Sequence, residues 1–423
     1  DIGVPTYTGF FDPSIGKRKL RDIISKLKST YCSSVGYEYM HIDARDKCNW
    51  LRERIEFLGE EPLPAEQKKN LHRRLASTVL FAEFLSKKFT TSKRFGLEGC
   101  DVFVPAFTYL VDRLVERGVQ YCCIGMPHRG RLSVLAHVLK KPLEQIFAEF
   151  QNIKSTEEGE EVWGNSGDVK YHLGTSYLRR YPDNKQIHLN ILANPSHLEA
   201  VNPVVYGKVA SKQYYSQDDK KQTAAAVLIH GDASFAGQGV VYETMQMESL
   251  RDYSIGGCIH IVVNNQIGFT TDPREARTGD YCTEIAKSIG APIFHVNADD
   301  PEAVMKVMNL AADFRQQFGT DVVIDLIGYR RFGHNELDQP MFTQPIMYKL
   351  IKKMENIYKK YTKKLIAEGV ITSDFDKNVA KKLNNEFEEK YQASRDKEFN
   401  SNEWEGGAWE DIKKPHMFGR IKD

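Results

Sequence analysis

Two stretches decide the fold of this chain: Ala224-Ala-Ala-Val-Leu-Ile-His-Gly-Asp232-Ala233 and Cys258-Ile-His-Ile-Val-Val-Asn-Asn265-Gln-Ile-Gly268. In each, an apolar, β-rich run of strand length ends in a short polar turn that contains glycine. Asp232 and Asn265 are 33 positions apart, which is enough for a strand, a crossover helix and the next parallel strand. The two stretches therefore predict neighbouring strands that carry Asp232 and Asn265 at the same edge of a sheet.

Apolar runs of this kind recur from about residue 119 and alternate with helical stretches. They are Tyr121–Met126, Ile187–Ala193, Ala224–Ile229, Cys258–Val263, Ile293–Val296 and Val322–Ile327. The alternation predicts an α/β fold with a doubly wound, mostly parallel sheet. A polar cluster follows each run, and ligands of open α/β sheets bind outside the carboxyl ends of the strands. We therefore expect one shared site at this rim of the sheet.

The regions that flank these runs have a different composition. Residues 1–92 are predicted to be helical, and Ala65–Lys88 carries apolar positions at helical spacing. Residues 93–345 form the predicted α/β domain, in which a helix begins at Pro105 and ends at Gly118. Residues 346–423 are rich in Lys and Glu and predict an exposed, helical linker, whereas residues 152–168 have the composition of a surface loop.

Composition excludes several classes of function. Among 423 residues, 58 are basic and 57 acidic, for a net charge of +1, which gives no electrostatic reason to expect nucleic acid or an anionic membrane as a partner. No apolar stretch approaches the ~18 residues of a membrane span. The seven scattered cysteines include no C-x-x-C pair, which favours a reducing compartment and argues against a zinc site.

The two polar turns offer oxygen ligands. Asp232 supplies a carboxylate, Asn265 an amide oxygen and Ile267 a main-chain carbonyl. Such ligands suit a hard cation such as Mg²⁺, which would hold a diphosphate beside the glycine turn. Asn264 is equally consistent with a role in shaping the turn. A solvated turn and a polar loop are the alternative interpretation of the pair.

Basic and histidine residues also follow the predicted strands. Arg129 offers a fork suited to phosphate, and His128 can donate or carry a proton near neutral pH. The alternative is a basic helix start with Arg131 in a surface salt bridge. Further histidines near the rim are His172, His197 and His334. No cysteine or pair of carboxylates accompanies them at the rim, so they favour anion binding and proton transfer, although a lone histidine such as His172 is more often structural than catalytic.

Seven strings in combination resemble the E1 component of 2-oxoglutarate dehydrogenase, a thiamine-diphosphate-dependent family. They are Arg94-Phe-Gly-Leu-Glu-Gly, Met126-Pro-His-Arg-Gly-Arg-Leu, Gly167-Asp-Val-Lys-Tyr-His-Leu-Gly, Asn194-Pro-Ser-His-Leu-Glu-Ala, His230-Gly-Asp-Ala-Ser-Phe-Ala-Gly-Gln-Gly, Val263-Asn-Asn-Gln-Ile-Gly-Phe-Thr-Thr and Gly333-His-Asn-Glu. The resemblance runs from about residue 60 to 375. Ala233 departs from the usual Gly-Asp-Gly signature of thiamine-diphosphate enzymes, but Gly-Asp-Ala is the usual form in this family.

The resemblance implies roles for individual residues. Thiamine diphosphate would be bound by Arg129, Asp232, Ala233, Ser234, Asn265 and Ile267, and its Mg²⁺ by Asp232, Asn265 and Ile267. The substrate pocket would be lined by Phe95, His128 and His172, and the catalytic residues would be His128, His172 and His334.

The implied activity is oxidative decarboxylation of 2-oxoglutarate, with succinyl transfer to a lipoyl group of the E2 acyltransferase in a complex that also holds E3. The resemblance also implies a homodimer at full length, located in the mitochondrial matrix in a eukaryote and otherwise in the cytoplasm. The chain resembles the front portion of a longer E1. Residues 93–345 would be its diphosphate-binding domain, and residues 346–423 would lead toward a pyrimidine-binding domain whose activating Glu lies outside this chain. The isolated chain is therefore expected to be inactive.

Two alternatives remain at this point. The E1 component of 2-oxoadipate dehydrogenase performs the same chemistry on a longer diacid, and Phe95 with Gly268-Phe269 favours the 2-oxoglutarate form by resemblance only. A non-catalytic half that assembles or regulates is the second alternative. A nicotinamide-binding Rossmann domain is disfavoured, because no G-x-G-x-x-G follows the first predicted strand of the sheet.

Overall fold

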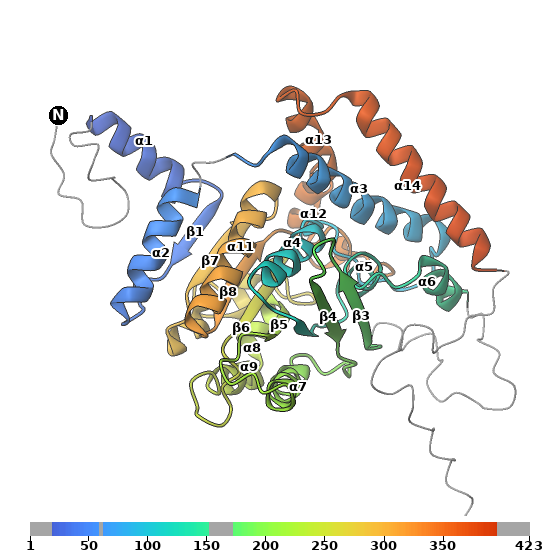
Figure 1. The fold of residues 1–423 in the computed structure, drawn as a ribbon. Coiled ribbons are helices and arrows are strands. Elements are labelled where there is room, and N and C mark those ends of the chain that lie inside the picture. The colour runs from blue at the N-terminus through green and yellow to red at the C-terminus, as the bar shows by residue number, and fades with distance from the viewer. Residues whose placement is uncertain (1–18, 59–61, 152–171, 396–423) are drawn as a thin grey trace, which may run out of the picture.

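A single eight-stranded sheet runs through the computed structural model, which describes residues 19–58, 62–151 and 172–395. The strand order is β1-β7-β8-β6-β5-β2-β4-β3 (Figure 1). The bounds are β1 Val35–Glu38, β2 Tyr121–Gly125, β3 Thr175–Arg180, β4 Gln186–Ile191, β5 Ala224–Gly231, β6 Cys258–Asn264, β7 Ile293–Asn297 and β8 Val322–Ile327. The six inner strands are parallel, and β1 and β3 add antiparallel edges. The predicted α/β fold with a mostly parallel sheet is confirmed.

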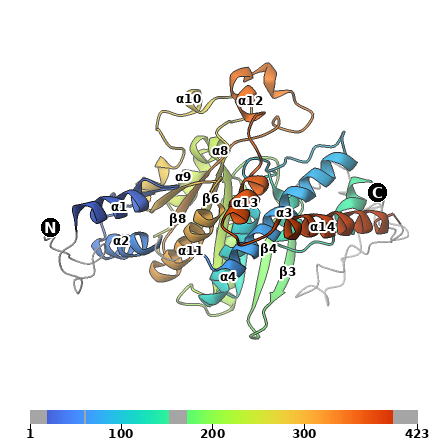
Figure 2. The ribbon, with the colours of Figure 1, turned by 90° about the horizontal axis from the view of Figure 1, so that it is seen from above.

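Helices cover both faces of the sheet (Figures 1 and 2). Their bounds are α1 Leu20–Tyr31, α2 Arg45–Leu58, α3 Ala65–Lys88, α4 Phe103–Glu116, α5 Arg131–His137, α6 Leu143–Phe150, α7 Val201–Tyr215, α8 Asp232–Gly237, α9 Gly239–Met245, α10 Pro273–Ala276, η2 Glu284–Ile289, α11 Pro301–Phe318, η3 Pro340–Phe342, α12 Pro345–Ile351, α13 Ile357–Ala367 and α14 Ser373–Ala393. Along β5, Val227 and Ile229 join the cluster that includes α4 and α11, whereas Leu228 joins the cluster that includes α7. Successive side chains of a strand alternate between faces, so a strand covered on both sides is apolar throughout.

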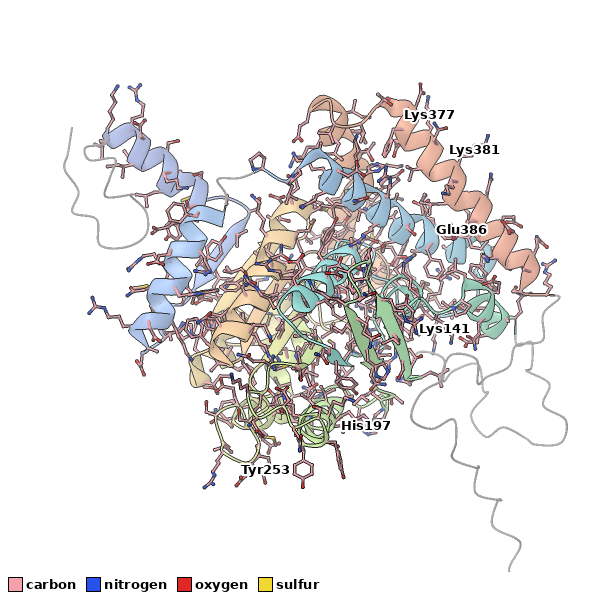
Figure 3. The ribbon with its side chains drawn as sticks, in the orientation of Figure 1. Lys141, His197, Tyr253, Lys377, Lys381 and Glu386 are labelled. Atoms are coloured by element: carbon pink, nitrogen blue, oxygen red, sulfur yellow. The ribbon has the colours of Figure 1, made fainter. Side chains whose placement is uncertain are left out.

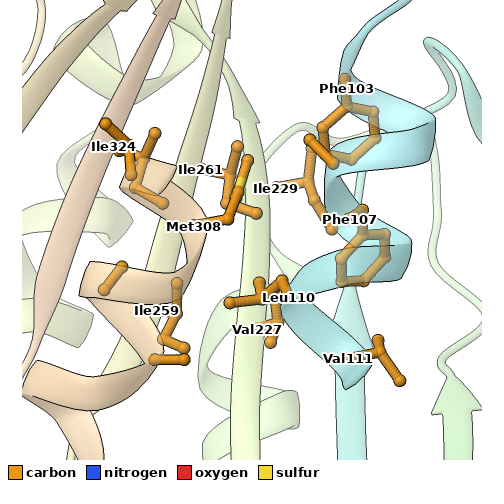
Figure 4. Close-up of a cluster of buried hydrophobic side chains, with 14 of the residues drawn as sticks. Phe103, Phe107, Leu110, Val111, Val227, Ile229, Ile259, Ile261, Met308 and Ile324 are labelled. Carbon is orange, nitrogen blue, oxygen red and sulfur yellow. The ribbon is translucent and has the colours of Figure 1, made fainter. Parts of the chain in front are cut away.

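The main core lies between the sheet and the pair α4 and α11. Figure 4 shows Phe103, Phe107 and Leu110 of α4 and Met308 of α11 packed over the central strands. Phe107 is fully buried, and burying a side chain of this size stabilises the fold by about 1.5–3 kcal/mol. Phe107 and Leu110, on the predicted helix α4, thus belong to the face that holds this helix on the sheet.

The predicted elements mostly coincide with the observed ones. Helix α3 spans the predicted Ala65–Lys88, and β8 spans the predicted Val322–Ile327. Helix α4 begins at Phe103, two residues before the predicted Pro105. Proline is tolerated throughout the first helical turn, where its missing N–H would have no intrahelical partner, so it marks the start of a helix only approximately. Gly118, with φ +91°, lies just past the end of the helix as predicted.

Two edge strands were not predicted. Strand β1 lies within the region 1–92 that was expected to be helical, and it pairs with β7, so that prediction is wrong at this point. Strand β3 pairs with β4 at the opposite edge. Both strands are short and partly exposed, so neither has the continuous apolar run that identifies the inner strands.

The helices that follow the sheet pack against α3 (Figure 1). Tyr361 and Leu365 of α13 share one apolar cluster with α3, and Phe387 of α14 shares another. Only the outer face of α14 is exposed, where Lys377 and Lys381 point away from the body of the molecule (Figure 3). The prediction of exposed helices therefore holds only for the outer face of α14. A few large apolar residues among many Lys and Glu suffice to pack α13 and α14 against α3. Within the described residues, no helix combines the length and apolarity of a membrane span.

Candidate functional site

The predicted site residues gather where the winding of the sheet reverses. From β2 the chain crosses to β4 on one side, and from β5 it continues to β6 and beyond on the other. Strands β2 and β5 are neighbours, so the switch point lies between their carboxyl ends. In open α/β sheets the ligand crevice forms at such a point. His128 and Arg129 follow β2 there, and Asp232 follows β5.

Asp232 is a buried carboxyl group at this rim. It follows β5 directly and starts α8, and the pairing of Gly231 with Val263 places it beside the turn that follows β6. The residue is 3% exposed, and burial raises the pKa of its carboxyl to about 6, from an ordinary value of 3.8. A carboxylate removed from water needs a positive partner. A bound cation would meet that need.

Asn265 supplies a second oxygen that fits a cation. Its side-chain Oδ1 is buried and has no hydrogen-bond partner among the described residues. Buried polar atoms are normally paired, so this amide oxygen is available as a ligand for a bound cation. A Cβ built on Gly268 would lie 2.6 Å from Cβ of Ala233, so the turn that contains Ile267 lies directly against the Asp232 turn. The residues present therefore fit a magnesium ion with oxygen ligands.

The composition of this ligand set differs from that of a transition-metal site. In the ranges 19–58, 62–151 and 172–395, no group of three or more His, Cys, Asp or Glu side chains is arranged to hold a metal. The set here consists of one carboxylate, one amide and one carbonyl, which favours a hard cation.

Asn264 and Ser234 are occupied by internal hydrogen bonds. Asn264 Nδ2 donates to Asp325 at 2.9 Å, and its Oδ1 accepts from the backbone N–H of Gln266 at 3.1 Å. Asn264 thus shapes the turn, one of the two roles left open by the sequence. Ser234 Oγ lies 2.5 Å from Glu199 and donates to it, so its hydroxyl proton is committed inside the fold. Its assignment to the cofactor stays a prediction that now depends on other atoms of the residue.

Aromatic and imidazole rings from four segments meet next to the switch point, and we call this group the ring cluster. The ring centroids of Phe95 and His128 are 4.4 Å apart, and that of His334 lies 5.6 Å from His128 and 5.7 Å from Phe95. The exposed ring of Phe269 lies 4.9 Å from His334. His172 is close enough for its charge to lower the pKa of His128. The structure thus brings Phe95, His128, His172 and His334 together, whereas the exposed His197 lies beside α7 (Figure 3).

Burial keeps the imidazoles of this ring cluster neutral. Burial, followed by the charges of Arg129 and His334, lowers the pKa of His128 to about 3. Burial, followed by Arg129 and Arg330, lowers the pKa of His334 to about 4. At neutral pH these rings therefore act as uncharged hydrogen-bonding groups. Positive charge for an anionic ligand therefore has to come from Arg129 and Arg330.

Two arginines near β2 hold the loops of the site. Arg129 donates to the carbonyl of Gly96 at 3.0 Å and to that of His334 at 2.7 Å, and so it joins two walls of the ring cluster. Arg131 is fully buried and donates to Met126 at 2.9 Å, to Asn194 at 2.7 Å, and to the carbonyls of Leu173 and Leu192. The alternative of a surface salt bridge for Arg131 is wrong, because its guanidinium satisfies backbone carbonyls inside the protein.

Sequence reasoning assigned no role to two residues that shape the site. Glu336 accepts from the backbone N–H groups of Arg94 and Gly96 and from the one between them, at 2.6 to 3.2 Å. Arg330 is buried and donates to Tyr348 at 3.0 Å and to the carbonyl of Phe269 at 2.9 Å. Glu336 belongs to Gly333-His-Asn-Glu, one of the strings that resemble the E1 family, and this membership could have identified it as a site residue. Arg330 sits in a basic pair with no distinguishing spacing.

Comparison with known proteins gives consistent results. A family model described as "Dehydrogenase E1 component" matches residues 73–403. The chain is 47% identical over 418 residues to the mitochondrial 2-oxoglutarate dehydrogenase of Dictyostelium discoideum, which covers 99% of this chain and 41% of that protein. It is 49% identical over 401 residues to the mitochondrial 2-oxoglutarate dehydrogenase of Saccharomyces cerevisiae, covering 94% of this chain and 39% of that protein. A Xenopus laevis protein named 2-oxoglutarate dehydrogenase-like, mitochondrial is 49% identical over 408 residues. The chain thus spans about two fifths of the length of these relatives.

Proposed function

The chain belongs to the dehydrogenase E1 component family, and on that premise we propose that it forms the diphosphate-binding part of a thiamine-diphosphate-dependent 2-oxoglutarate dehydrogenase. The reaction is oxidative decarboxylation of 2-oxoglutarate with transfer of the succinyl group to a lipoyl group of an E2 acyltransferase. One observation carries the proposal. The carboxyl of Asp232 and the orphaned oxygen of Asn265 are both buried at neighbouring strand ends, at the switch point of the sheet.

The cofactor site is proposed from the fit of these residues. Asp232, Asn265 and the carbonyl of Ile267 would hold Mg²⁺, and the Mg²⁺ would hold the diphosphate. Arg129 is half-buried beside the same rim, and its charge suits the anionic end of the cofactor. Bound thiamine diphosphate would supply the nucleophilic carbon and the electron sink that decarboxylation needs.

The ring cluster is the proposed substrate pocket. A five-carbon keto diacid has to place a carboxylate inside the protein, where it needs hydrogen-bond donors or positive charge. His128 and His334 would supply neutral donors, because burial prevents them from carrying charge, and His172 would supply a third donor. Phe95 would present an apolar wall to the chain of the substrate. Neutral donors of this kind can also stabilise negative charge that develops at the keto oxygen.

Substrate, partners and location follow the same proposal. The names of the relatives place those proteins in mitochondria, which favours a mitochondrial location for this chain. At full length the protein would act with E2 and E3, as a homodimer in the mitochondrial matrix. The 2-oxoadipate enzyme is the nearest alternative for the substrate. Steady-state rates with 2-oxoglutarate and 2-oxoadipate on the same active preparation distinguish the two, and a higher kcat/KM for 2-oxoadipate would replace the proposal.

We propose further that these 423 residues do not complete the reaction alone. The relatives are more than twice as long as this chain, and the described residues are assigned only to the diphosphate end of the cofactor and to the substrate pocket. Purified chain with excess thiamine diphosphate and Mg²⁺ is expected to release no CO₂ from 2-oxoglutarate. Measurable release in a preparation free of other E1 enzymes would show that this chain contains the whole catalytic apparatus.

Calorimetric titration tests the cofactor site. Thiamine diphosphate with Mg²⁺ is titrated into the protein and into the variant Asp232→Ala, which removes the one full negative charge among the proposed ligands. Asp299→Ala is the matched control, because this aspartate follows strand β7 of the same sheet and is paired with Lys360 instead. Loss of binding in the first variant and unchanged binding in the second support the proposal. Unchanged binding in both variants contradicts it.

A further inference from the structure

A chain of interacting charged and polar side chains runs from η2 across strands β1, β7 and β8 toward the turn that follows β6. Lys287 Nζ lies 2.7 Å from a carboxylate oxygen of Glu38, whose other oxygen lies 2.7 Å from His295 Nε2. His295 Nδ1 lies 2.8 Å from Asp325 Oδ2. The other oxygen of Asp325 accepts from Asn264, the residue that shapes the turn before Asn265. The chain therefore links the edge strand β1 to that turn.

Proton counting fixes the charge of His295. Both ring nitrogens face carboxylate oxygens, which accept hydrogen bonds and donate none while ionised. Two hydrogen bonds require two N–H protons, and only the imidazolium form has both. The ring of Tyr281, with its centroid 4.3 Å away, covers one face, and Cys282 Sγ lies 4.0 Å from Asp325. The charges then alternate along Lys287, Glu38, His295 and Asp325 and sum to zero.

Asp325 needs this positive charge. It is fully buried on β8, and a buried carboxylate is costly unless a partner compensates it. Its negative charge contributes to the raised pKa of nearby Asp232. With His295 protonated, Asp325 keeps its hydrogen bond to Asn264 without adding a net charge beneath the site. Asn264 in turn accepts from Gln266, whose φ of +59° sets the turn that aims Asn265.

We propose that His295 is a permanently protonated positioning residue that acts through Asp325 and Asn264 to hold the amide oxygen of Asn265 in place for Mg²⁺. The proposal rests on the proposed function for the identity of the ion. The interactions from Lys287 through Glu38 and His295 to Asp325 stand on geometry alone and include none of the proposed metal ligands. Partners behind metal ligands commonly change metal affinity about 10- to 100-fold when they are removed.

The protonation state is tested without any cofactor. Protein labelled with ¹⁵N in its histidines is examined by ¹⁵N NMR at pH 8, and the signals of His295 are assigned by their loss in His295→Gln. Two protonated ring nitrogens are expected for His295. The exposed His197 provides a reference signal in the same spectrum. One protonated and one bare nitrogen at residue 295 would overturn the proposal, whatever the protein binds.

A double-mutant cycle tests how His295 acts. Mg²⁺ is titrated at saturating thiamine diphosphate into wild type, His295→Gln, Asp325→Asn and the double variant. His295→Gln should weaken Mg²⁺ about tenfold, but Asp325→Asn removes the charge that His295 neutralises, so the same change should have little further effect in the double variant. Additive losses would overturn the coupling.

The matched control is His188→Gln, on strand β4 away from the chain, which should leave Mg²⁺ affinity unchanged. An equal loss in that variant would make the effect of His295→Gln a general loss of packing. If wild type binds no Mg²⁺ with thiamine diphosphate, the proposed function fails, while the NMR result for His295 stands independently.

Discussion

The carboxylate of Glu336 accepts a hydrogen bond from the backbone N–H of Phe95 at 3.2 Å, across 241 positions of sequence. The same carboxylate accepts from the amides on either side, at 2.6 and 3.0 Å. Phe95 has φ +50°, a conformation that non-glycine residues rarely adopt. Glu336 therefore holds a strained turn that places the ring of Phe95 against His128.

Replacing Glu336 with Gln should loosen this turn. A side-chain NH₂ group would face backbone N–H donors, and an unsatisfied buried amide costs about 1–3 kcal/mol. Hydrogen–deuterium exchange of the peptide that contains Arg94, Phe95 and Gly96 should become faster. The control is Asp338→Asn, since Asp338 accepts from the exposed backbone of Asn335. Equal exchange rates in wild type and Glu336→Gln would show that the turn is stable without the carboxylate of Glu336.

The buried imidazole of His128 predicts a loss of stability in acid. Its pKa is about 3 in the folded protein, lowered by burial, whereas an unfolded histidine titrates near 6.5. Between these values the unfolded state binds the extra proton, so the free energy of unfolding falls as the pH drops below about 6.5. His128→Gln should lose less stability than wild type between pH 7 and pH 4. Urea unfolding at each pH measures this, and parallel curves would contradict the lowered pKa.

Arg131 should matter for stability more than any surface arginine. Arg131→Met removes the donor for four neutral acceptors inside the protein, and a buried acceptor that is left unpaired costs about 1–3 kcal/mol. The matched control is Arg73→Met on α3, where the arginine is 44% exposed and pairs with Glu66. That change should cost within about 0.5 kcal/mol. Chemical denaturation of both variants measures the free energy of unfolding. Similar losses of stability in the two variants would contradict this role of Arg131.

His172 is predicted to recognise the second carboxylate of the substrate. In an active preparation, His172→Ala should reduce kcat/KM for 2-oxoglutarate more than for a 2-oxo acid that lacks the distal carboxylate, because only the diacid loses a donor. Steady-state kinetics with both acids measures the difference. Equal losses for the two substrates would assign His172 to the cofactor or to the structure of the pocket.

The sequence by itself determined the α/β class, the inner strands and the long helix Ala65–Lys88. The inner strands are continuous apolar runs and the helix has apolar residues at a regular period, and both patterns are local properties of the chain. It also determined that Asp232 and Asn265 end neighbouring strands, as their pairing confirms, because the spacing leaves room for one crossover. The resemblance predicted that Phe95, His128 and His334 all belong to the site, although no local pattern relates residue 95 to residue 334.

Only the tertiary structure decided how the charged residues are used. Arg131 has the sequence context of a surface cation, yet its guanidinium is enclosed by carbonyls from three segments. Strand β1 has no apolar run that would mark it in the sequence. It is a strand because it pairs with β7 at the edge of the sheet. His295, between Glu38 and Asp325, depends on three strands meeting. Burial and the approach of distant charges set the state of such groups, and both arise only when the chain has folded.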